Sequence, residues 1–226
     1  MSDTDTRQTR ITHLRTIQNM PNIQKTMEFE IQEKTICFQG FFRMERYRLR
    51  HRKFNGEWGR PITRELFERG HAAAVLPYDP QTDEIVLIEQ FRAGAMSAAR
   101  GPWLLEIVAG VIEVNETPEQ VAARESLEEA GCQINNLIPL YDYLVSPGGT
   151  TEQITLFCGQ VDIKTIDMGS IHGNDEEDED IKVHVMPLND ALKLLNTGRI
   201  NSASAIIALQ WLALNRDFVR QHWLPE

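Results

Sequence analysis

One helix in the middle of this chain is marked at both of its ends in the sequence. Thr117 can cap the N-terminus, and Gln120 three residues later completes a capping box. Pro118 suits the first helical position, where its missing N–H costs no hydrogen bond. Gly131 suits the position just past the C-terminus, where the backbone turns left-handed. These signals predict a helix over residues 118–130.

Three glutamates lie on one face of this predicted helix. Glu125, Glu128 and Glu129 are spaced i, i+3 and i+4, so their carboxylates crowd together. Carboxylates this close repel one another unless cations lie among them, and hard oxygen ligands suit Mg²⁺ or Mn²⁺. The alternative is a solvated acidic surface, in which Arg124 and Glu128 form an ordinary i,i+4 pair. The residues expected to pack on the core from the opposite face are Ala123, Leu127 and Ala130.

The whole segment resembles the Nudix box, a long gapped pattern of glycine, glutamate and arginine. Two residues depart from the pattern, because Ser126 and Cys132 stand where an aliphatic residue is usual, and both are small enough to pack on the core side. A match of this length favours a metal-binding catalytic site over a solvated helix. The resemblance implies an α+β fold in which a mixed β-sheet is sandwiched between helices. The positions in register are Gly110, Glu116, Arg124, Glu125, Glu128, Glu129 and Gly131.

Strands precede and follow the acidic helix, and helices end the chain. Short strands are expected over residues 27–58, where Asn55-Gly56 is a strong hairpin signal and 41–50 forms an extended segment. This order of elements indicates an α+β or mixed layered fold. Further strands are expected over residues 71–76, 84–91, 103–109, 137–145, 153–160 and 181–186, and closing helices over 188–196 and 202–215. The domains expected are a disordered tail over residues 1–25, a small antiparallel β-sheet domain over 26–62 and a Nudix domain over 63–226.

The bulk composition limits the classes of function. With 226 residues, 42% of them hydrophobic, the chain is long enough for one large domain or one domain with a smaller attachment. A net charge of −10 argues against nonspecific binding to nucleic acid or membranes. No apolar run reaches membrane-spanning length, and the N-terminal stretch has no secretory signal. Cys37, Cys132 and Cys158 are odd in number and widely spaced, so we expect reduced thiols in a cytoplasmic protein.

Several segments outside the box resemble the ADP-ribose pyrophosphatase branch of the Nudix family. The segment 146–152 lies between two expected strands and carries Pro147 at about the place where that branch has a proline. The other matching segments are residues 67–70 (FERG), 87–92 (LIEQFR) and 104–110 (LLEIVAG). The resemblance extends over nearly all of residues 41–214. It implies Mg²⁺-dependent hydrolysis of ADP-ribose to AMP and ribose 5-phosphate, with Mn²⁺ able to replace Mg²⁺.

The resemblance also implies which residues hold the metal. Glu128 would contact the metal directly or tune the residues that do, and Arg124 would orient a glutamate of the box. The metal would neutralise the diphosphate and stabilise charge on the transferring phosphoryl group. The implied ligands are Glu125, Glu129, Glu179 and the backbone carbonyl of Ala109.

A second acidic run, residues 171–180, invites two interpretations. The first is a solvated surface loop, which is the usual place for such a run. The second follows from the resemblance, in which a loop carboxylate takes a proton from the attacking water. The His-Gly pair at the start of the run and the acidic residues at its end place Glu177 at the base position and Glu179 at a metal contact. Glu176, one residue away, and Glu179 are the alternative bases.

Substrate contacts are implied at both arginines and aromatic residues. A guanidinium can make two parallel hydrogen bonds to a diphosphate, which suits Arg64 and Arg92. Phe41 and Phe42 resemble the aromatic pair that holds the base ring, and strand residues packed on a core are the equal alternative. The branch also implies a homodimer in which the N-terminal sheet reaches into the partner's site, so that Phe41, Phe42 and Arg64 act in trans. The full implied set is Phe41, Phe42, Arg64, Glu65, Arg92, Val111, Ser146, Gly148 and Glu152.

Other functions stay open at this point. The same chemistry would serve a Nudix hydrolase of another nucleoside diphosphate sugar, such as GDP-mannose, or of dinucleoside polyphosphates. A noncatalytic Nudix-like module that senses a nucleotide metabolite is a second alternative, but it would not need the complete set of box glutamates. A purely acidic interaction protein is a third, and it would bind neither Mg²⁺ nor Mn²⁺.

Overall fold

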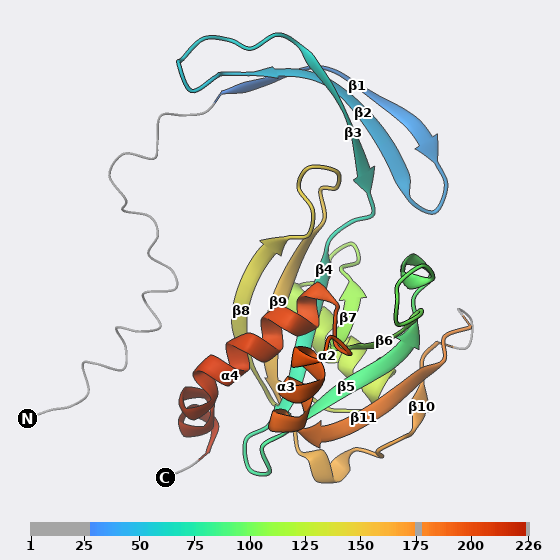
Figure 1. Ribbon diagram of the computed structural model, residues 1–226, viewed down its shortest axis with the longest axis vertical. Helices are drawn as coiled ribbons and strands as arrows, with labels where there is room; N and C mark the ends of the chain where they lie inside the picture. Colours follow the sequence, from blue (N-terminus) through green and yellow to red (C-terminus); the bar gives the residue numbers. More distant parts are fainter. Residues whose placement is uncertain (1–27, 175–177, 225–226) are drawn as a thin grey trace, which may run out of the picture. The chain divides into compact units, whose positions relative to one another are not determined.

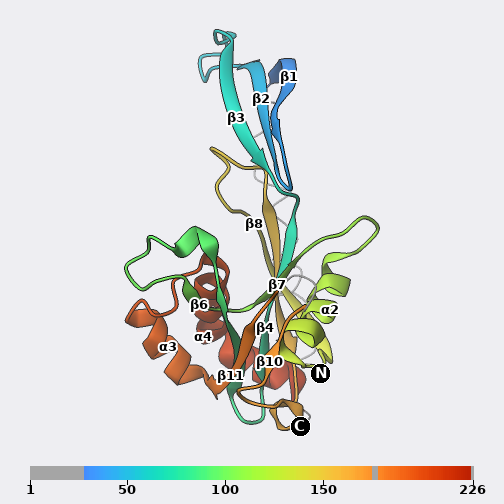
Figure 2. The same ribbon diagram turned by 90° about the vertical axis from the view of Figure 1, so that its right-hand side faces the viewer.

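The computed structural model describes residues 28–174 and 178–224. The described chain divides into two compact units (Figures 1 and 2). One unit holds residues 28–40 and 44–65, and the other holds 41–43 and 66–224. Of the expected site residues, Glu176 and Glu177 lie outside the described residues.

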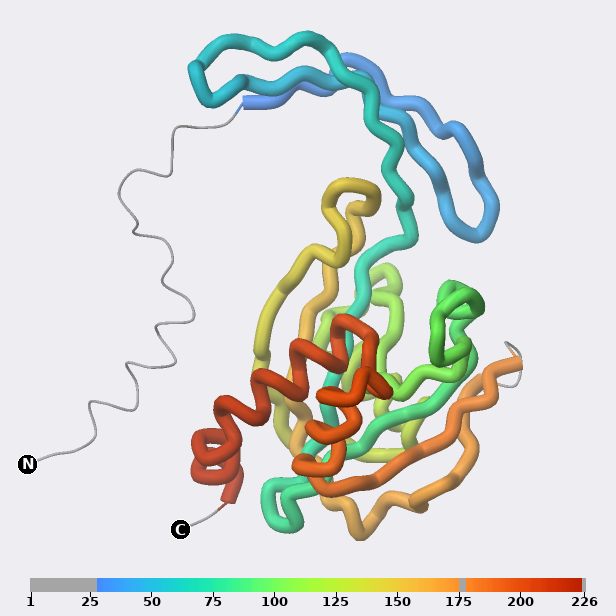
Figure 3. The backbone as a smooth tube through the Cα atoms, in the orientation of Figure 1, coloured from blue at the N-terminus to red at the C-terminus, as the bar shows by residue number. Residues whose placement is uncertain are grey.

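The smaller unit is built on a three-stranded sheet of order β1-β2-β3. Its strands are β1 (Phe29–Gln39), β2 (Arg43–His51) and β3 (Ile62–Glu68), drawn in blue to cyan in Figure 3. The hairpin predicted at Asn55-Gly56 is present: the Gly56 amide donates to the Lys53 carbonyl, and Gly56 has a φ of 86°. That positive φ favours glycine because it has no Cβ. Every residue of β1 is exposed.

The larger unit contains a mixed sheet of order β10-β11-β5-β4-β9-β8. Its centre is β4, which pairs in parallel with β9 and antiparallel with β5, and which is buried at every position. Two short strands lie off this path, because β6 pairs with β5 and β7 pairs with β4. The strands are β4 (Ala72–Asp79), β5 (Glu84–Phe91), β6 (Trp103–Glu106), β7 (Val108–Val111), β8 (Asn136–Leu144), β9 (Gln153–Gln160), β10 (Ile171–His172) and β11 (Ile181–Pro187).

Helices cover both faces of this sheet. Helix α2 (Pro118–Ala130) packs on one face, and α3 (Leu188–Asn196) and α4 (Ala203–Trp223) pack on the other (Figure 2). Alternate residues of the central strands feed two separate cores: Ala73 and Val75 of β4 face α2, whereas Ala74 and Leu76 face α3 and α4. This alternation is the period of two that a strand imposes. The predicted mixed sheet between helices is therefore confirmed. None of the described helices is long and apolar enough to cross a bilayer.

Most element boundaries agree with the sequence prediction. The helices at 118–130 and 188–196 and the strands at 84–91 and 153–160 have the predicted limits. The predicted strand 103–109 is instead broken at Ile107, because the chain there leaves β5 and crosses to β4. The last helix does not end at 215 but continues to Trp223, where Arg216 and Arg220 form ion pairs with Asp83.

The prediction of which side of α2 faces the core was partly wrong. Ala130 is buried as predicted, but Ala123 is exposed and Leu127 is 62% exposed. The residues that pack inward are Val121, Ala122, Ser126, Glu129 and Ala130. The helix is rotated because it carries a buried carboxylate toward the sheet, which a purely apolar reading of its faces does not anticipate. Ser126 and Cys132 are buried, as their small size predicted.

Candidate active site

Both ends of α2 are held by the hydrogen bonds that the sequence predicted. The Gln120 amide donates to the Thr117 hydroxyl at 3.3 Å, and the Thr117 amide donates to the Gln120 side chain at 2.8 Å. At the other end Gly131 is left-handed, with a φ of 60°, and its amide donates to the Leu127 carbonyl. These contacts fix where the helix starts and stops, and therefore which way its glutamates point.

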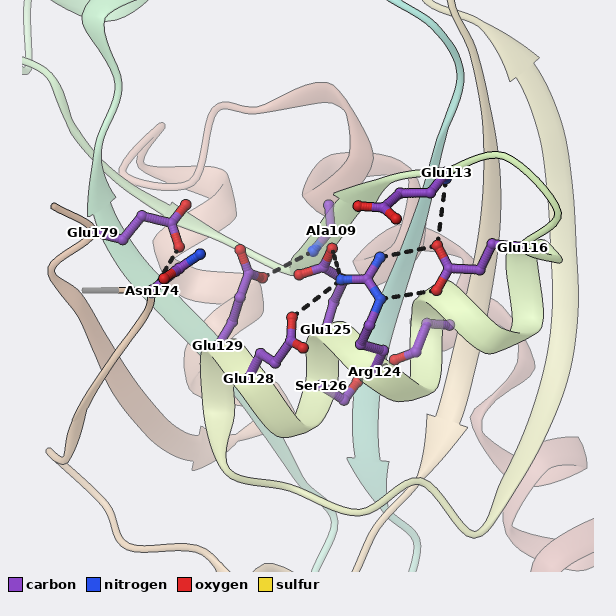
Figure 4. A network of polar contacts seen from close by, with 11 residues as sticks. Ala109, Glu113, Glu116, Arg124, Glu125, Ser126, Glu128, Glu129, Asn174 and Glu179 are labelled. Atoms are coloured by element: carbon purple, nitrogen blue, oxygen red, sulfur yellow. Dashed lines mark hydrogen bonds and ion pairs between the residues drawn. The ribbon is translucent and has the colours of Figure 1, made fainter. Parts of the chain in front are cut away.

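Glu129 is the most deeply buried carboxylate of the helix. It is 5% exposed, and its Oε2 accepts the Ala109 amide of β7 at 3.1 Å (Figure 4). Burial raises the pKa of Glu129 to about 8, and the negative charge of Glu125 adds to that rise. The Ala109 amide and the positive charge of Arg92 act in the opposite direction. The site thus holds a carboxyl group that is costly to ionise unless positive charge is supplied.

Glu125 lies directly against the backbone of β7. A Cβ built on Gly110 would be 1.7 Å from Glu125 Oε1, so only glycine leaves room for this side chain. Burial raises the pKa of Glu125, and Glu128 and Glu179 raise it further, while Arg124 lowers it. Gly110 is therefore a spacer for a carboxylate, a role that its place in the box pattern did not reveal.

Arg124 neutralises the outer part of the cluster. Its Nε and Nη2 donate to the two carboxylate oxygens of Glu116 at 2.8 and 3.0 Å. Its Nη1 donates to Glu125 at 2.7 Å and to Glu128 at 3.1 Å (Figure 4). The bond from Arg124 lowers the pKa of Glu116. These contacts agree with a role for Arg124 in orienting glutamates of the box, and the i,i+4 pair with Glu128 is present as well.

Glu179 faces the helix from a different part of the chain. Its carboxylate accepts the Asn174 amide at 3.2 Å, and its charge raises the pKa values of Glu125 and Glu129. Figure 4 places Glu179 opposite Glu129. The structure therefore brings one residue of the second acidic run to the glutamates of α2. Glu179 and the glutamates of α2 are more than forty residues apart in sequence.

The donor set fits a hard divalent cation. Carboxylate oxygens and a backbone carbonyl are the ligands that such ions prefer. The crowded, partly desolvated glutamates have raised pKa values, and a nearby cation would favour their ionised form. Among residues 28–174 and 178–224 no three ligand side chains converge closely enough to form a metal site by themselves. Glu125 and Glu128 are hydrogen-bonded to Arg124, so a cation would compete with Arg124 for these two carboxylates.

Arg92 approaches the same carboxylates from the end of β5. Its Nε donates to Glu106 of β6 at 2.7 Å, and its charge is felt at Glu129. Glu106 was not predicted as a site residue. A sequence signal was available, because Glu106 is the one charged residue of the segment 104–110 (LLEIVAG), which carried part of the resemblance.

The segment 146–152 contributes one buried acid and several exposed positions. Ser146 and Gly148 are exposed in the turn, whereas Glu152 is buried and lies 3.5 Å from the Arg69 guanidinium. The same guanidinium lies over the Phe42 ring at 5.5 Å. Arg69 was not predicted as a site residue, although it belongs to the FERG segment that carried part of the resemblance.

The remaining expected substrate residues fall in different places. Phe41 and Phe42 form an edge-to-face pair in the bend between β1 and β2, and Phe41 is 96% exposed, so it is not a core residue. Val111 ends β7 and is exposed. Arg64 and Glu65 belong to the smaller unit, where Glu65 pairs with Arg46. Of the predicted set, Arg64 and Glu65 thus belong to a different unit from α2.

Replacing Gly110 with alanine tests the carboxylate seat. The new methyl group occupies the position of the Glu125 carboxylate, so we expect Gly110→Ala to lower the affinity for Mn²⁺ by about 10- to 100-fold. Calorimetric titration of Mn²⁺ measures this loss. Gly94→Ala, whose added methyl meets open space, is the matched control and should bind as the wild type does. Equal affinity in both variants would contradict the seat.

The raised pKa of Glu129 predicts how metal-free stability depends on pH. The folded state holds this proton up to a pKa of about 8, against 4.5 for an ordinary glutamate, so between these values it binds more protons than the unfolded state. The free energy of unfolding therefore falls as pH rises through this window, by at most about 1.4 kcal/mol per pH unit. Glu129→Gln should reduce this slope in urea unfolding with EDTA at pH 5 to 8, leaving the contribution of Glu125, whose pKa is also raised. Glu128→Gln, at an exposed carboxylate, should retain it, and parallel slopes in wild type and Glu129→Gln would disprove the prediction.

Comparison with known proteins identifies the family. The family model described as "NUDIX domain" matches residues 68–208. The ADP-ribose pyrophosphatase of Escherichia coli (strain K12) is 44% identical over 205 residues, which are 91% of this chain and 97% of the relative. That of Haemophilus influenzae is 44% identical, over 87% of this chain and 91% of the relative. The GDP-mannose pyrophosphatase of Pectobacterium atrosepticum is 32% identical, over 84% and 97%.

A solved structure supports the same fold. The crystal structure of an ADP compounds hydrolase superposes with a TM-score of 0.62 and covers 87% of this chain and 96% of its own, at 22% sequence identity. Its likeness concerns the arrangement of the sheet and helices alone. The box residues, their placement on α2 and β7, and the matched family model lead to one conclusion: this chain belongs to the Nudix family.

Proposed function

We propose that this protein is a Nudix pyrophosphohydrolase that cleaves the diphosphate of ADP-ribose to AMP and ribose 5-phosphate. The observation that carries the reaction class is the burial of Glu125 and Glu129 against the backbone of β7. Relatives named ADP-ribose pyrophosphatase, at 44% identity over most of both chains, support the substrate. Nudix hydrolases generally need a divalent metal ion, and we propose Mg²⁺, with Mn²⁺ as a substitute.

The proposed metal ligands are Glu125, Glu129, Glu179 and the Ala109 carbonyl. When bound, the metal would neutralise the diphosphate and stabilise charge on the transferring phosphoryl group. Arg124 keeps Glu125 and Glu128 oriented through its hydrogen bonds. Glu177 would accept the proton of the attacking water, a proposal that rests on its place in the second acidic run.

Substrate recognition is proposed for residues on several elements. The terminal nitrogens of Arg92 would bind the diphosphate, and Phe41 and Phe42 would hold the base ring. The exposure of Phe41 supports this, since a stacking residue must present its ring to the ligand. Further proposed contacts are Arg64, Glu65, Val111, Ser146, Gly148 and Glu152.

Assembly and location are also proposed. Residues 63–226 would form the hydrolase domain, and residues 26–62 would join two copies, so that Phe41, Phe42 and Arg64 act in the partner's site; residues 1–25 would form a tail. The exposed apolar residues of β1, among them Phe29, Ile36 and Phe38, support an interface on the N-terminal sheet. The three free cysteines support a cytoplasmic location.

A second candidate substrate is GDP-mannose. Relatives from Pectobacterium and Yersinia named GDP-mannose pyrophosphatase are 32% and 36% identical, which supports GDP-mannose as the alternative substrate. A noncatalytic sensing module is less well supported, because the chain keeps the complete set of box glutamates, which a binding module would not need.

A substrate panel with a matched variant tests the proposal. We expect the protein with Mg²⁺ to release AMP from ADP-ribose faster than it cleaves GDP-mannose, UDP-glucose, NADH or diadenosine polyphosphates, and to lose the activity in EDTA. Glu125→Gln should lower kcat by at least about 100-fold, because it removes a charged ligand without changing size. Glu119→Gln, on the exposed first turn of α2, should not. Faster cleavage of another sugar nucleotide would replace the substrate, and full activity in Glu125→Gln would reject the metal site.

The proposed dimer predicts an effect of a charge on β1. Phe38→Asp places a carboxylate in the exposed apolar strand and should weaken self-association by about tenfold or more. Sedimentation velocity over a concentration series measures the change. Phe54→Asp, at a residue in the hairpin turn that is even more exposed than Phe38 (97% against 64%), should leave the dimer intact. A wild-type protein that is monomeric and fully active would rule out sites shared between copies.

A further inference from the structure

Glu106 is bound to Arg92 in a way that leaves part of the guanidinium available. The Nε of Arg92 donates to Glu106 Oε2 at 2.7 Å. Within the described residues, no other hydrogen bond is made by the Arg92 guanidinium. The two terminal nitrogens carry the other four N–H groups, and one N–H from each points in parallel away from the side chain. A diphosphate prefers to be bound by such a pair of N–H groups acting in parallel.

The strand register places this pair on the side of the sheet that carries α2. Glu106 is the partner of Ile88, whose side chain belongs to the core beneath α2. Arg92 continues the extended backbone of β5, with a φ of −123° and a ψ of 109°, and its amide donates to the Pro102 carbonyl. Because side chains alternate along a strand, Ile88 and Arg92 point to the same face.

The carboxylates around Arg92 differ in what they would do to it. Its positive charge already lowers the pKa of Glu129, so the guanidinium lies within electrostatic reach of the acidic cluster. Without a partner of its own it would be drawn toward Glu125, Glu129 and Glu179. The Glu106 side chain is 15% exposed, whereas the Arg92 side chain is 43% exposed, and Glu106 is anchored in a paired strand. It can therefore hold the arginine apart from the cluster.

We propose that Glu106 is a positioning residue, which fixes Arg92 so that its terminal N–H groups receive the diphosphate of the substrate. This inference rests on the proposed hydrolysis of a nucleoside diphosphate sugar and adds a residue to that site. Glu106 acts through Arg92 and does not contact the substrate. Lysine at position 92 would not replace arginine, because an ammonium group cannot bind Glu106 and a diphosphate in this fixed geometry.

Steady-state kinetics with a charge-matched control tests the proposal. Glu106→Gln should raise the KM for ADP-ribose about tenfold with a smaller change in kcat, as expected when one charged hydrogen bond that orients a binding group is lost. Glu89→Gln is the control, because Glu89 is also an ion-paired glutamate next to this site in sequence, but it pairs with Arg199 and its cross-strand partner Leu105 faces the other core. It should keep the wild-type KM. Equal KM values for the two variants, or the same KM as wild type in Glu106→Gln, would overturn the proposal.

A double-mutant cycle separates positioning from direct action. If Glu106 acts only through Arg92, Glu106→Gln should have no further effect on kcat/KM in an Arg92→Ala background. A loss that is as large in that background as in the wild type would overturn the proposal.

A readout without substrate keeps this inference separate from the proposed function. In nitrogen-15 NMR spectra the Arg92 Nε–H signal, assigned by its loss in Arg92→Lys, should exchange slowly with solvent in wild type and Glu89→Gln and rapidly in Glu106→Gln. A slow signal in Glu106→Gln would overturn the tether whatever the substrate. If wild type instead cleaves another nucleoside diphosphate sugar, the ADP-ribose proposal fails, and the same kinetic comparison on that sugar decides the role of Glu106.

Discussion

The rest of this site depends on one contact, the seating of two carboxylates of α2 against the backbone of β7. Glu129 takes the Ala109 amide, and Glu125 lies where a side chain at Gly110 would otherwise be. Both carboxyl groups are removed from water, which raises their pKa values and makes them costly to ionise alone. Positive charge must therefore lie near these two carboxyl groups if they are to be ionised.

The need for positive charge beside the buried carboxyl groups explains the arrangement of the arginines. The chain carries a net charge of −10, yet it handles a negatively charged substrate under the function proposed above. Arg124 binds the outer glutamates of the box, and the charge of Arg92, whose Nε is held by Glu106, acts on Glu129. Arg69 pairs in the same way with the buried Glu152. Each guanidinium is thus held in place by a carboxylate. Positive charge is therefore placed at particular points of the site, although the protein as a whole is negatively charged.

Local sequence signals were reliable wherever the deciding interaction was local. The capping box and the terminal glycine of α2 involve residues three or four apart, and the helix has the predicted limits. Prediction was weaker where tertiary contacts decide. The strand expected over 103–109 is broken at Ile107 because its two halves pair with different strands, and the last helix extends to Trp223 because Asp83 binds its arginines. Leu127 is exposed because the opposite face of α2, which carries Glu129, packs on the sheet.

By itself, the sequence determined the limits of α2, the spacing of its glutamates, the limits of β5 and β9, and the family to which the chain belongs. Those features depend on the 3.6-residue turn of a helix, the two-residue repeat of a strand and end-capping, all of which act over a few residues. Only the tertiary structure decided which carboxylate is buried, that Gly110 is a seat for Glu125, and that Glu106 is the partner of Arg92. These depend on the register between strands and on the rotation of a helix over a sheet, and packing of residues far apart in sequence fixes both.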